Sequence, residues 1–281
     1  MMRVISLVPS VTQSIVDLGL GNTLIGVTEF CQLYPELEQQ VDKIGTPKKV
    51  AVEQVFRLRP DFVFCNPEEN SQKDVEEMQE LGIPVVLQFP KTIDQALSDL
   101  WEIARLLKSQ SAAARVDMLE RSWEWFRDSQ ASEPKRRVFC PIWQSIDDLA
   151  QPWWMAFNGD TYPGDVIRQF GGENIFETRQ RLYPLEADLG LLKAEDPGSR
   201  DVRYPRVTQD EIIEAQPEII LLPSEPFAYS EGHVSLFLKL FGDTPAGKYQ
   251  RVRLVDGRLL TWHGTFLAHT LVELPDVLIC E

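Results

Sequence analysis

KTIDQALSDLWEIARLLKSQSAAARVDMLERSWEWFRDSQASE, from Lys91 to Glu133, contains neither Gly nor Pro, the two residues that most disfavour a helix interior. Thr92 is a suitable N-terminal cap for a helix. The pattern predicts one long helix, or two nearly collinear helices, that joins two lobes. A coiled coil is the alternative, although the apolar stripe weakens around Ser109 to Ser111. The apolar residues recur at helical spacing: Ile93, Leu97, Leu100, Ala104, Leu107, Val116, Leu119, Trp123 and Phe126.

Strand and helix patterns alternate on both sides of this stretch. The helical pattern Val52 to Leu58, for example, leads through Pro60-Asp61 into the apolar run Phe62 to Cys65. Such alternation is typical of a parallel sheet flanked by helices. We therefore predict an α/β fold with two parallel-sheet lobes, 1–90 and 135–281, joined by a long backbone helix at 91–134. A ligand cleft is expected between the lobes.

One segment occurs twice. VEQVFRLRPDFVFCNPEEN, Val52 to Asn70, has a counterpart in QDEIIEAQPEIILLPSEPF, Gln209 to Phe227. Both read as a helix, a proline followed by an acid, a buried strand and an acidic loop. A matching unit on each side of a connecting helix predicts a pseudo-symmetric, two-lobed protein. Chance similarity between two ordinary helix-to-strand junctions is the alternative.

Composition limits the classes of partner. The chain has 281 residues, 43% of them hydrophobic, which is enough for two modest α/β cores. Its formal net charge of −15 argues against a nucleic-acid groove and against an anionic membrane surface. We expect no nucleic acid, no membrane insertion and a monomer that binds a small molecule.

The cysteines and the first residues bear on the compartment. Cys31, Cys65, Cys140 and Cys280 are far apart and form no CxxC pair, which predicts free thiols. No basic start with a following apolar run precedes the first strand, so the sequence as it stands predicts a cytoplasmic protein. A periplasmic or otherwise extracytoplasmic location is the alternative if a signal was removed.

Eight segments together resemble the helical-backbone metal-receptor superfamily. Its members include the class III solute-binding proteins that deliver cobalamin, haem or ferric siderophores to ABC importers. The resemblance covers nearly the whole chain in order, and it implies two α/β lobes joined by a backbone helix with the ligand in the cleft. The segments are ISLVPSVTQSIVDLGLGNTLIGVTEFC, RPDFVF, NPEEN, LGIPV, FGGENIF, RYPRVT, LLPSEPF and VDGRLLTWHGT.

The resemblance implies a binding protein with no intrinsic cofactor. Its ligand would be a metal-containing chelate: cobalamin or a similar corrinoid first, then haem or an iron-siderophore. Family members also present a surface Glu from each lobe to arginines of an ABC importer permease. Near the expected position in the first lobe this chain has Gln72, with Glu76 and Glu77 one turn later. A cytoplasmic protein that stores, senses or handles a corrinoid or chelate therefore stays open as an alternative.

Aromatic faces with a few convergent polar groups suit a large, flat macrocycle. Core packing is the alternative for Trp143 and Trp153, and a solvated loop is the alternative for Glu68. Glu69 and Glu225 lie at matched places in the repeated segment, which strengthens both. The predicted ligand-binding residues are Phe30, Cys31, Tyr34, Asn66, Glu68 and Glu69 in the first lobe, and Trp143, Trp153, Trp154, Glu225, Trp262 and His263 in the second.

His263 is the one histidine that we predict to reach the metal of a bound ligand. It follows Trp262, and Gly264 allows a close approach of the backbone. A hydrogen-bonded loop histidine is the alternative. A hydrolytic enzyme is the competing class, with Asp160, Glu173 or Glu225 as acid or base. Against it, the sequence contains no GxSxG, P-loop, GxGxxG or HExxH motif.

Overall fold

The computed structural model describes residues 2–130, 135–145 and 152–278. The chain divides into two compact units. The N-terminal unit runs as far as Trp123 and also takes in His263–Ala268, whereas the C-terminal unit contains Glu124–Trp262 and the chain from His269 onward. The predicted ranges 1–90, 91–134 and 135–281 stay a prediction about domains. Glu133 and Cys280 lie outside the described residues.

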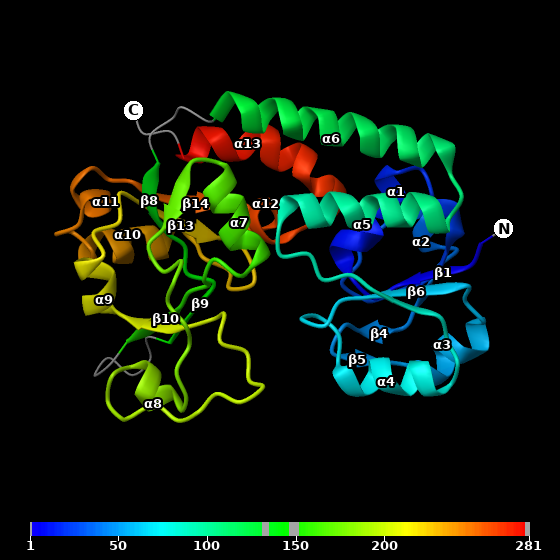
Figure 1. Ribbon diagram of the computed structural model, residues 1–281, viewed down its shortest axis with the longest axis horizontal. Coiled ribbons are helices and arrows are strands. Elements are labelled where there is room, and N and C mark those ends of the chain that lie inside the picture. Colours follow the sequence, from blue (N-terminus) through cyan, green and yellow to red (C-terminus); the bar gives the residue numbers. More distant parts are fainter. Residues whose placement is uncertain (1, 131–134, 146–151, 279–281) are drawn as a thin grey trace. The chain divides into compact units, whose positions relative to one another are not determined.

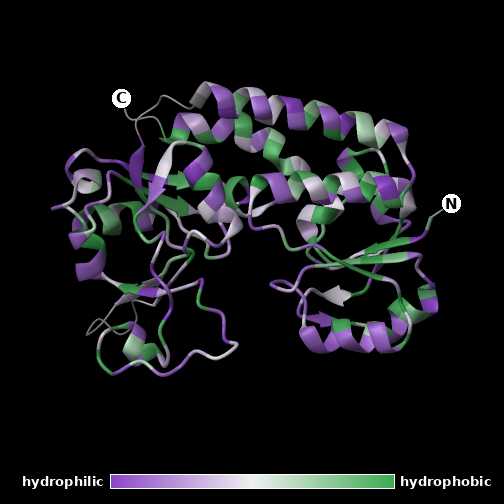
Figure 2. Cartoon of the chain, in the orientation of Figure 1, coloured by the Kyte–Doolittle hydropathy of each residue, from purple (hydrophilic) through white to green (hydrophobic). Residues whose placement is uncertain are grey.

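Five parallel strands form the sheet of the N-terminal unit, in the order β3-β2-β1-β6-β7. Figure 1 labels β1 and β6 of this sheet. The central strands are short and buried on both faces, as expected of a parallel sheet covered by helices. They are largely green in Figure 2, whereas α4 (Gln72–Glu80) is largely purple. The strands are β1 (Val4–Ser6), β2 (Leu24–Val27), β3 (Asp42–Lys43), β6 (Phe62–Cys65) and β7 (Val85–Leu87).

Helices and one small hairpin complete this unit. Its core is almost entirely aliphatic, with Ile5, Val55, Val63 and Met78 all without exposed surface. The remaining elements before the long helical region are α1 (Pro9–Asp17), the 3₁₀ turn Gly21–Thr23, α2 (Pro35–Glu38), the antiparallel pair β4 (Gly45–Thr46) and β5 (Lys49–Val50), and α3 (Val52–Leu58).

The C-terminal unit contains two sheets. Four parallel strands have the order β11-β8-β13-β14, and three antiparallel strands have the order β12-β10-β9. The antiparallel sheet was not predicted from the sequence. The strands are β8 (Arg136–Phe139), β9 (Trp143–Ser145), β10 (Trp153–Met155), β11 (Gly172–Asn174), β12 (Arg206–Thr208), β13 (Ile219–Pro223) and β14 (Val252–Val255).

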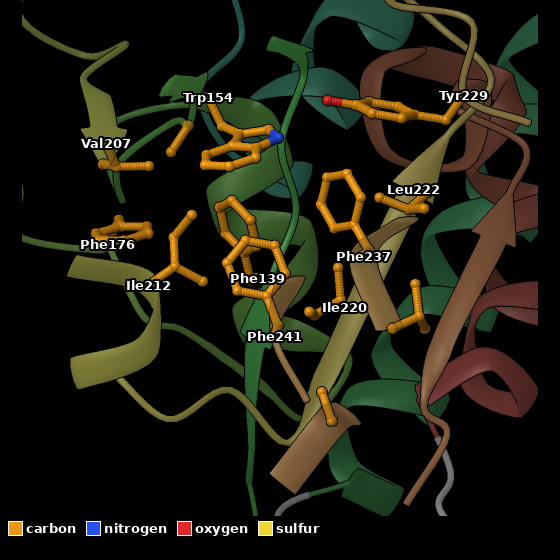
Figure 3. Packing of buried hydrophobic residues seen from close by; sticks show 13 residues of the cluster. Phe139, Trp154, Phe176, Val207, Ile212, Ile220, Leu222, Tyr229, Phe237 and Phe241 are labelled. Carbon is orange, nitrogen blue, oxygen red and sulfur yellow. The ribbon is translucent and has the colours of Figure 1, made fainter. Parts of the chain in front are cut away.

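Aromatic side chains dominate the core of this unit. Trp154 makes edge contacts with the rings of Phe237 and Phe241, at 5.9 and 5.4 Å between ring centroids, and Phe139 lies against Phe241 (Figure 3). The helices are α7 (Tyr162–Gln169), α8 (Leu185–Asp188), α9 (Gln209–Glu214), α10 (Glu231–Leu240), α11 (Pro245–Lys248), α12 (Arg258–Thr261) and most of α13 (Leu267–Leu278).

The repeated segment has the same structure in both units. It forms α3 and β6 in the first and α9 and β13 in the second. Both helices end at a residue in the left-handed conformation directly before a proline, Arg59 at φ 49° and Gln216 at φ 47°. The strand order β2-β1-β6-β7 corresponds to β11-β8-β13-β14. The predicted α/β fold with two parallel sheets is confirmed.

The long helical region differs from the prediction. It forms two helices, α5 (Ile93–Leu106) and α6 (Gln110–Gln130), which run antiparallel side by side (Figure 1). The indole of Trp101 donates to Glu120 Oε2 at 3.0 Å, and that of Trp123 donates to Asp94 Oδ1 at 2.9 Å. The prediction of one helix, or two nearly collinear ones, was therefore wrong for the described residues 91–130. The long helix is α6, of 21 residues.

The chain reverses direction at Lys108 and Ser109, between the two helices. Lys108 has φ 51°, a left-handed conformation that ends α5, and the Ser109 hydroxyl accepts a hydrogen bond from the Ala112 amide at 3.2 Å. Thr92 caps the start of α5 as predicted, because its hydroxyl accepts from the Gln95 amide. The gap in the apolar stripe at Ser109 to Ser111 was the sequence signal for this turn.

Candidate functional site

Loops at the carboxyl ends of parallel strands are where open α/β sheets bind ligands. In the N-terminal unit two of the predicted groups follow this rule. The loop 28–34 follows β2, and the loop 66–70 follows β6. These strands flank β1 in the sheet, so their carboxyl ends lie at one edge.

Loop 28–34 presents two aromatic rings to solvent. Phe30 is 63% and Tyr34 is 60% exposed. Between them Cys31 is buried, and its Sγ lies 3.1 Å from Thr12 Oγ1 and 3.2 Å from Thr28 Oγ1. Burial raises the pKa of this thiol. Cys31 thus anchors the loop from inside, and its neighbours project outward.

An open hollow of about 460 Å³ adjoins this loop. Lys43 lines it and fixes the loop, because its Nζ donates to the Cys31 carbonyl at 2.9 Å and pairs with Glu38 at 3.5 Å. Polar and apolar groups both line the hollow, which suits the polar edge of a small molecule. The lining residues are Glu29, Cys31, Gln32, Leu33, Glu38 and Lys43.

Two asparagines shape the loop after β6. The Asn66 side chain accepts from the Glu68 amide at 2.8 Å, and the Asn66 amide donates to Asn70 Oδ1 at 2.8 Å. The Asn70 amide group in turn donates to the Leu7 carbonyl at 3.1 Å. Asn66 is buried and serves the loop itself, whereas Glu68 is exposed and Glu69 is half-buried.

The alignment of the two repeated segments corrects the predicted correspondence between Glu69 and Glu225. A gap-free alignment through Pro60 and Pro217 pairs Glu225 with Glu68, one residue before Glu69. The matching of Glu69 with Glu225 was therefore off by one position. Glu225 is half-buried, and its Oε1 accepts from the Thr261 hydroxyl at 3.1 Å.

The antiparallel sheet of the C-terminal unit has two chemically different faces. Residues directly opposite on neighbouring strands share a face, and the face alternates along each strand. The pairing of Trp154 with Gln144 and Val207 defines the inner face, which is buried in the aromatic core (Figure 3). The outer face carries Trp143, Ser145, Trp153, Met155, Arg206 and Thr208.

The tryptophans of this sheet therefore have different surroundings. Trp143 is 45% exposed and contacts the ring of Phe227 edge-on at 5.5 Å. Trp153 is half-buried beneath the guanidinium of Arg206, at 5.7 Å from the ring centroid. Trp154 has no exposed surface at all. Core packing, which was the alternative for Trp143 and Trp153, describes Trp154 instead.

Trp262 and Glu225 lie near the same short helix, α12. The Arg258 guanidinium lies 5.7 Å from the Trp262 ring centroid and forms an ion pair with Asp256 at 2.6 Å. Hydrogen bonds from Arg258 lower the pKa of Asp256 although partial burial opposes this. This part of the unit holds its charges in internal pairs and leaves Trp262 half-buried.

His263 belongs to the N-terminal unit, not to the second lobe in which the sequence placed it. Its side chain is only 6% exposed, and its Nε2 lies 3.3 Å from the Ser10 hydroxyl on α1. Burial lowers the pKa of His263 to about 4, so the imidazole is neutral at pH 7. Its role as a metal ligand stays a prediction.

The segment around His263 is held tightly on α1. The Thr265 amide donates to Ser14 Oγ at 3.1 Å, and the Thr265 hydroxyl donates to Asp17 Oδ2 at 2.7 Å. Gly264 has φ +89°, and a Cβ there would lie 2.3 Å from Ser14 Oγ. Only glycine fits this backbone position without strain.

Two further observations concern the described residues as a whole. Within them, no three His, Cys, Asp or Glu side chains are grouped so that they could hold a metal ion. In the same residues, every helix is too short or too polar to span a lipid bilayer.

Comparison with known proteins decides the family. A model of the family described as "Periplasmic binding protein" matches residues 4–256. The chain belongs to the periplasmic binding protein family. The superfamily inferred from the sequence motifs is thereby confirmed.

Curated relatives share part of the sequence with this family member. A vitamin B12-binding protein of Yersinia pestis (strain Pestoides F) is 26% identical over 221 residues, which are 78% of this chain and 69% of the relative. The vitamin B12-binding protein of Yersinia pseudotuberculosis (serotype O:1b, strain IP 31758) has the same identity and coverage.

Solved structures share the fold. A periplasmic vitamin B12 binding protein of Vibrio cholerae superposes with a TM-score of 0.75 at 18% identity, over 98% of this chain and 96% of the other. A periplasmic haem binding protein of the same organism gives 0.75 at 18% identity over 99% of each chain. The two-lobed fold of these binding proteins is therefore the fold of this family member.

Sequence reasoning missed the arginines of the C-terminal unit. Arg181 and Arg206 lie close to the outer face of the antiparallel sheet, and neither was among the predicted ligand-binding residues. The available signal was the alternation of arginine with aromatic residues in RQRLY, Arg179 to Tyr183, and in RYPR, Arg203 to Arg206.

Proposed function

We propose that this chain is a non-catalytic binding protein for a metal-containing chelate or macrocycle, with a cobalamin-like corrinoid as the first candidate. Membership of the periplasmic binding protein family, together with curated relatives that are vitamin B12-binding proteins, carries the proposal. The curated relatives are binding proteins and not enzymes, which supports a binding role for this chain.

Exposed aromatic rings support a flat ligand. Phe30 and Tyr34 in the N-terminal unit, and Trp143 in the C-terminal unit, are large side chains left open to solvent at loop or sheet positions. Such rings are costly to leave in water and offer broad apolar contact to a macrocycle. Trp153 adds a second, partly covered ring on the face of Trp143.

Four of the predicted residues do not enter the proposed contact set. Trp154, Cys31, Asn66 and His263 are buried and already packed or hydrogen-bonded. The proposed contacts are Phe30, Tyr34, Glu68, Glu69, Trp143, Trp153, Glu225 and Trp262.

Haem is the second candidate ligand. Two solved haem-binding proteins superpose as well as the B12-binding protein does, each with a TM-score of 0.75, and one of them is in complex with two haems. A ferric siderophore is the third. Neither requires the buried His263 as an axial ligand, because recognition through stacking and hydrogen bonds to the periphery is sufficient to hold a chelate.

A titration of the purified chain tests the proposal. Cobalamin, haem and a ferric siderophore are added separately, while ligand absorbance and tryptophan emission are recorded. We expect saturable one-to-one binding of at least one of them, with quenched emission. Trp143→Ala should weaken it by about tenfold or more, as expected for a large aromatic contact. Trp125→Ala, at an exposed ring on α6, is the matched control. Absence of saturable binding for all three ligands would overturn the proposal.

We further propose that the chain works outside the cytoplasm and delivers its ligand to an ABC importer permease. The family match and the periplasmic relatives support this. Glu77 and Glu76 on the exposed side of α4 are the candidates for permease contact, although Glu76 accepts a hydrogen bond from Gln72 at 2.7 Å. Cell fractionation tests the location, and recovery only in the cytoplasm would favour the chelate-handling alternative.

A further inference from the structure

Arg181 and Arg206 of the C-terminal unit differ from the neighbouring Arg179 and Arg203 in their ion pairing. Arg179 pairs with Asp188 at 3.1 Å and with Glu211 at 3.2 Å, and Arg203 pairs with Asp201 at 2.6 Å. In the described parts of the chain, Arg181 and Arg206 form no ion pair with a carboxylate. The chain has a formal net charge of −15, so carboxylates outnumber basic groups.

Arg181 is held by stacking and has unused hydrogen-bond donors. Its guanidinium lies 4.3 Å from the centre of the Tyr183 ring, and Arg200 lies over the same ring at 4.2 Å. The Nε of Arg181 is buried and has no hydrogen-bond partner in the described structure. A buried donor without an acceptor is costly, so Arg181 gains from any acceptor that reaches its guanidinium.

Arg206 also keeps donors free. Its Nη1 donates to the Tyr204 carbonyl at 2.6 Å, and the plane of the guanidinium lies over Trp153. A guanidinium has five N–H donors, and this bond uses one of them. Burial and the positive charge of Arg181 both lower the pKa of Arg206. The two cations are therefore close enough to repel each other.

The charge of Asp188 raises the pKa of Arg206 and so offsets this pair only in part. Asp188 is buried and already bound to Arg179. Its two oxygens also accept from the backbone amides of Leu182 at 2.9 Å and Arg206 at 2.7 Å. Asp188 thus fixes the backbone beside both arginines, while Arg181 has no carboxylate partner in the described structure.

We propose that Arg181 and Arg206 form a binding site for an oxyanion, a carboxylate or phosphate group carried at the edge of the bound chelate. This inference rests on the proposed function. Arg206 lies on the outer face of the antiparallel sheet together with Trp143 and Trp153. A macrocycle stacked on these tryptophans would place its peripheral groups beside the guanidinium of Arg206.

The chemistry favours an oxyanion over other ligands. Guanidinium forks match the two oxygens of a carboxylate or phosphate and form short, charge-assisted hydrogen bonds with them. Tyr183 and Trp153 hold the two forks in place before the ligand binds, which lowers the entropy cost of ordering them. Haem carries carboxylates and cobalamin carries a phosphate, so either candidate ligand can supply the group.

Inorganic phosphate is the first probe, because it tests the site without any chelate. Thermal unfolding is measured at constant ionic strength with phosphate or chloride. Phosphate should raise the melting temperature of the wild type and of Arg200→Gln, since a ligand that binds only the folded state stabilises it. It should not do so for Arg181→Gln/Arg206→Gln. Equal shifts in all three proteins, or no shift in the wild type, would overturn the site.

Paired ligands then identify the source of the oxyanion. Haem is compared with its dimethyl ester, and cobalamin is compared with cobinamide, which lacks the phosphate together with the ribose and base of the nucleotide loop. Removal of the anionic group should weaken binding to the wild type by about tenfold, as expected for a charged hydrogen-bonded contact. The double variant should discriminate between the members of a pair less than the wild type does. If the wild type binds both members equally and the double variant loses nothing, the arginines do not contact the chelate.

Two lysine variants distinguish loss of the oxyanion site from loss of folding. Arg181→Lys and Arg206→Lys keep the charge but not the planar fork, and each should retain part of the phosphate effect. Failure of every chelate to bind would refute the proposed function, whereas the phosphate measurement would still decide the arginine site.

Discussion

The two units share one strand order but differ in what fills and covers it. In the N-terminal unit the helices enclose an aliphatic core, and the exposed aromatic rings of the candidate site stand on a loop. In the C-terminal unit the core is aromatic, and an added antiparallel sheet carries tryptophans and arginine on its outer face. The repeated strands thus form the scaffold, whereas the aromatic residues that we propose to contact the ligand lie outside the repeated segment.

Removal of the central tryptophan should give the largest effect. Trp154→Ala should lower the free energy of unfolding by about 3–5 kcal/mol, because it opens a cavity among packed rings. Denaturant unfolding measures this value. Trp154→Phe retains much of the packing and removes an indole N–H that has no partner in the described structure, so it should cost far less. A loss below about 1 kcal/mol for the alanine variant would contradict the central place of Trp154 in this core.

The buried histidine should make the stability of the N-terminal unit depend on pH. Burial holds the pKa of His263 at about 4, below the ordinary value of 6.5. The unfolded chain therefore takes up the proton first, and stability is lost as pH falls from 6.5 towards 4. The slope should be about 1.4 kcal/mol per pH unit, or about 3 kcal/mol in all.

Unfolding at several pH values checks this effect. His263→Gln should remove that part of the slope. His269→Gln, at an exposed side chain that forms a surface pair with Glu273, is the matched control. An unchanged slope in His263→Gln would show that another group is responsible.

A glycine pair separates backbone strain from steric clash. Gly264 and Gly82 both have a positive φ, of +89° and +73°, but of the two only Gly264 has an atom within 3 Å of the place that a Cβ would occupy. Gly264→Ala should cost about 2–3 kcal/mol and Gly82→Ala about 1 kcal/mol. Denaturant midpoints measure the difference. Equal costs would mean that α1 yields to the extra methyl group.

The sequence was sufficient for the fold class because apolar periodicity and the repeated helix-to-strand segment are local signals. The reversal at Lys108 was harder to predict. Apart from the gap in the apolar stripe, a left-handed lysine between two amphipathic helices has no strong sequence signature. Tertiary contacts such as that of Trp101 with Glu120 fix the antiparallel arrangement.

The candidate site was predicted less completely. Phe30 and Tyr34 project from their loop because Cys31 turns inward, an alternation that the sequence alone does not reveal. Trp153 and Trp154 are neighbours in sequence and lie on opposite faces, so their roles depended on which face of an unpredicted sheet is buried. The burial of His263 arises from its return to α1, which is 253 residues away from it in sequence at Ser10.

We expect the smallest change in stability for replacement of Trp143, because its side chain is exposed whereas that of Trp154 is fully buried. Trp143→Ala should alter the free energy of unfolding by no more than about 1 kcal/mol, because much of its ring is already in water. Denaturant unfolding of the two alanine variants side by side checks this. A cost comparable to that of Trp154→Ala would place Trp143 in the core.

Calorimetric titration of Trp143→Ala/Trp153→Ala tests whether the outer face of the antiparallel sheet recognises the ligand. The wild type and the variant are compared with whichever of cobalamin and haem the wild type binds. We expect the variant to stay folded and to bind the ligand at least about tenfold more weakly than the wild type. Unchanged affinity in the folded variant would contradict the assignment of ligand recognition to the outer face of the antiparallel sheet.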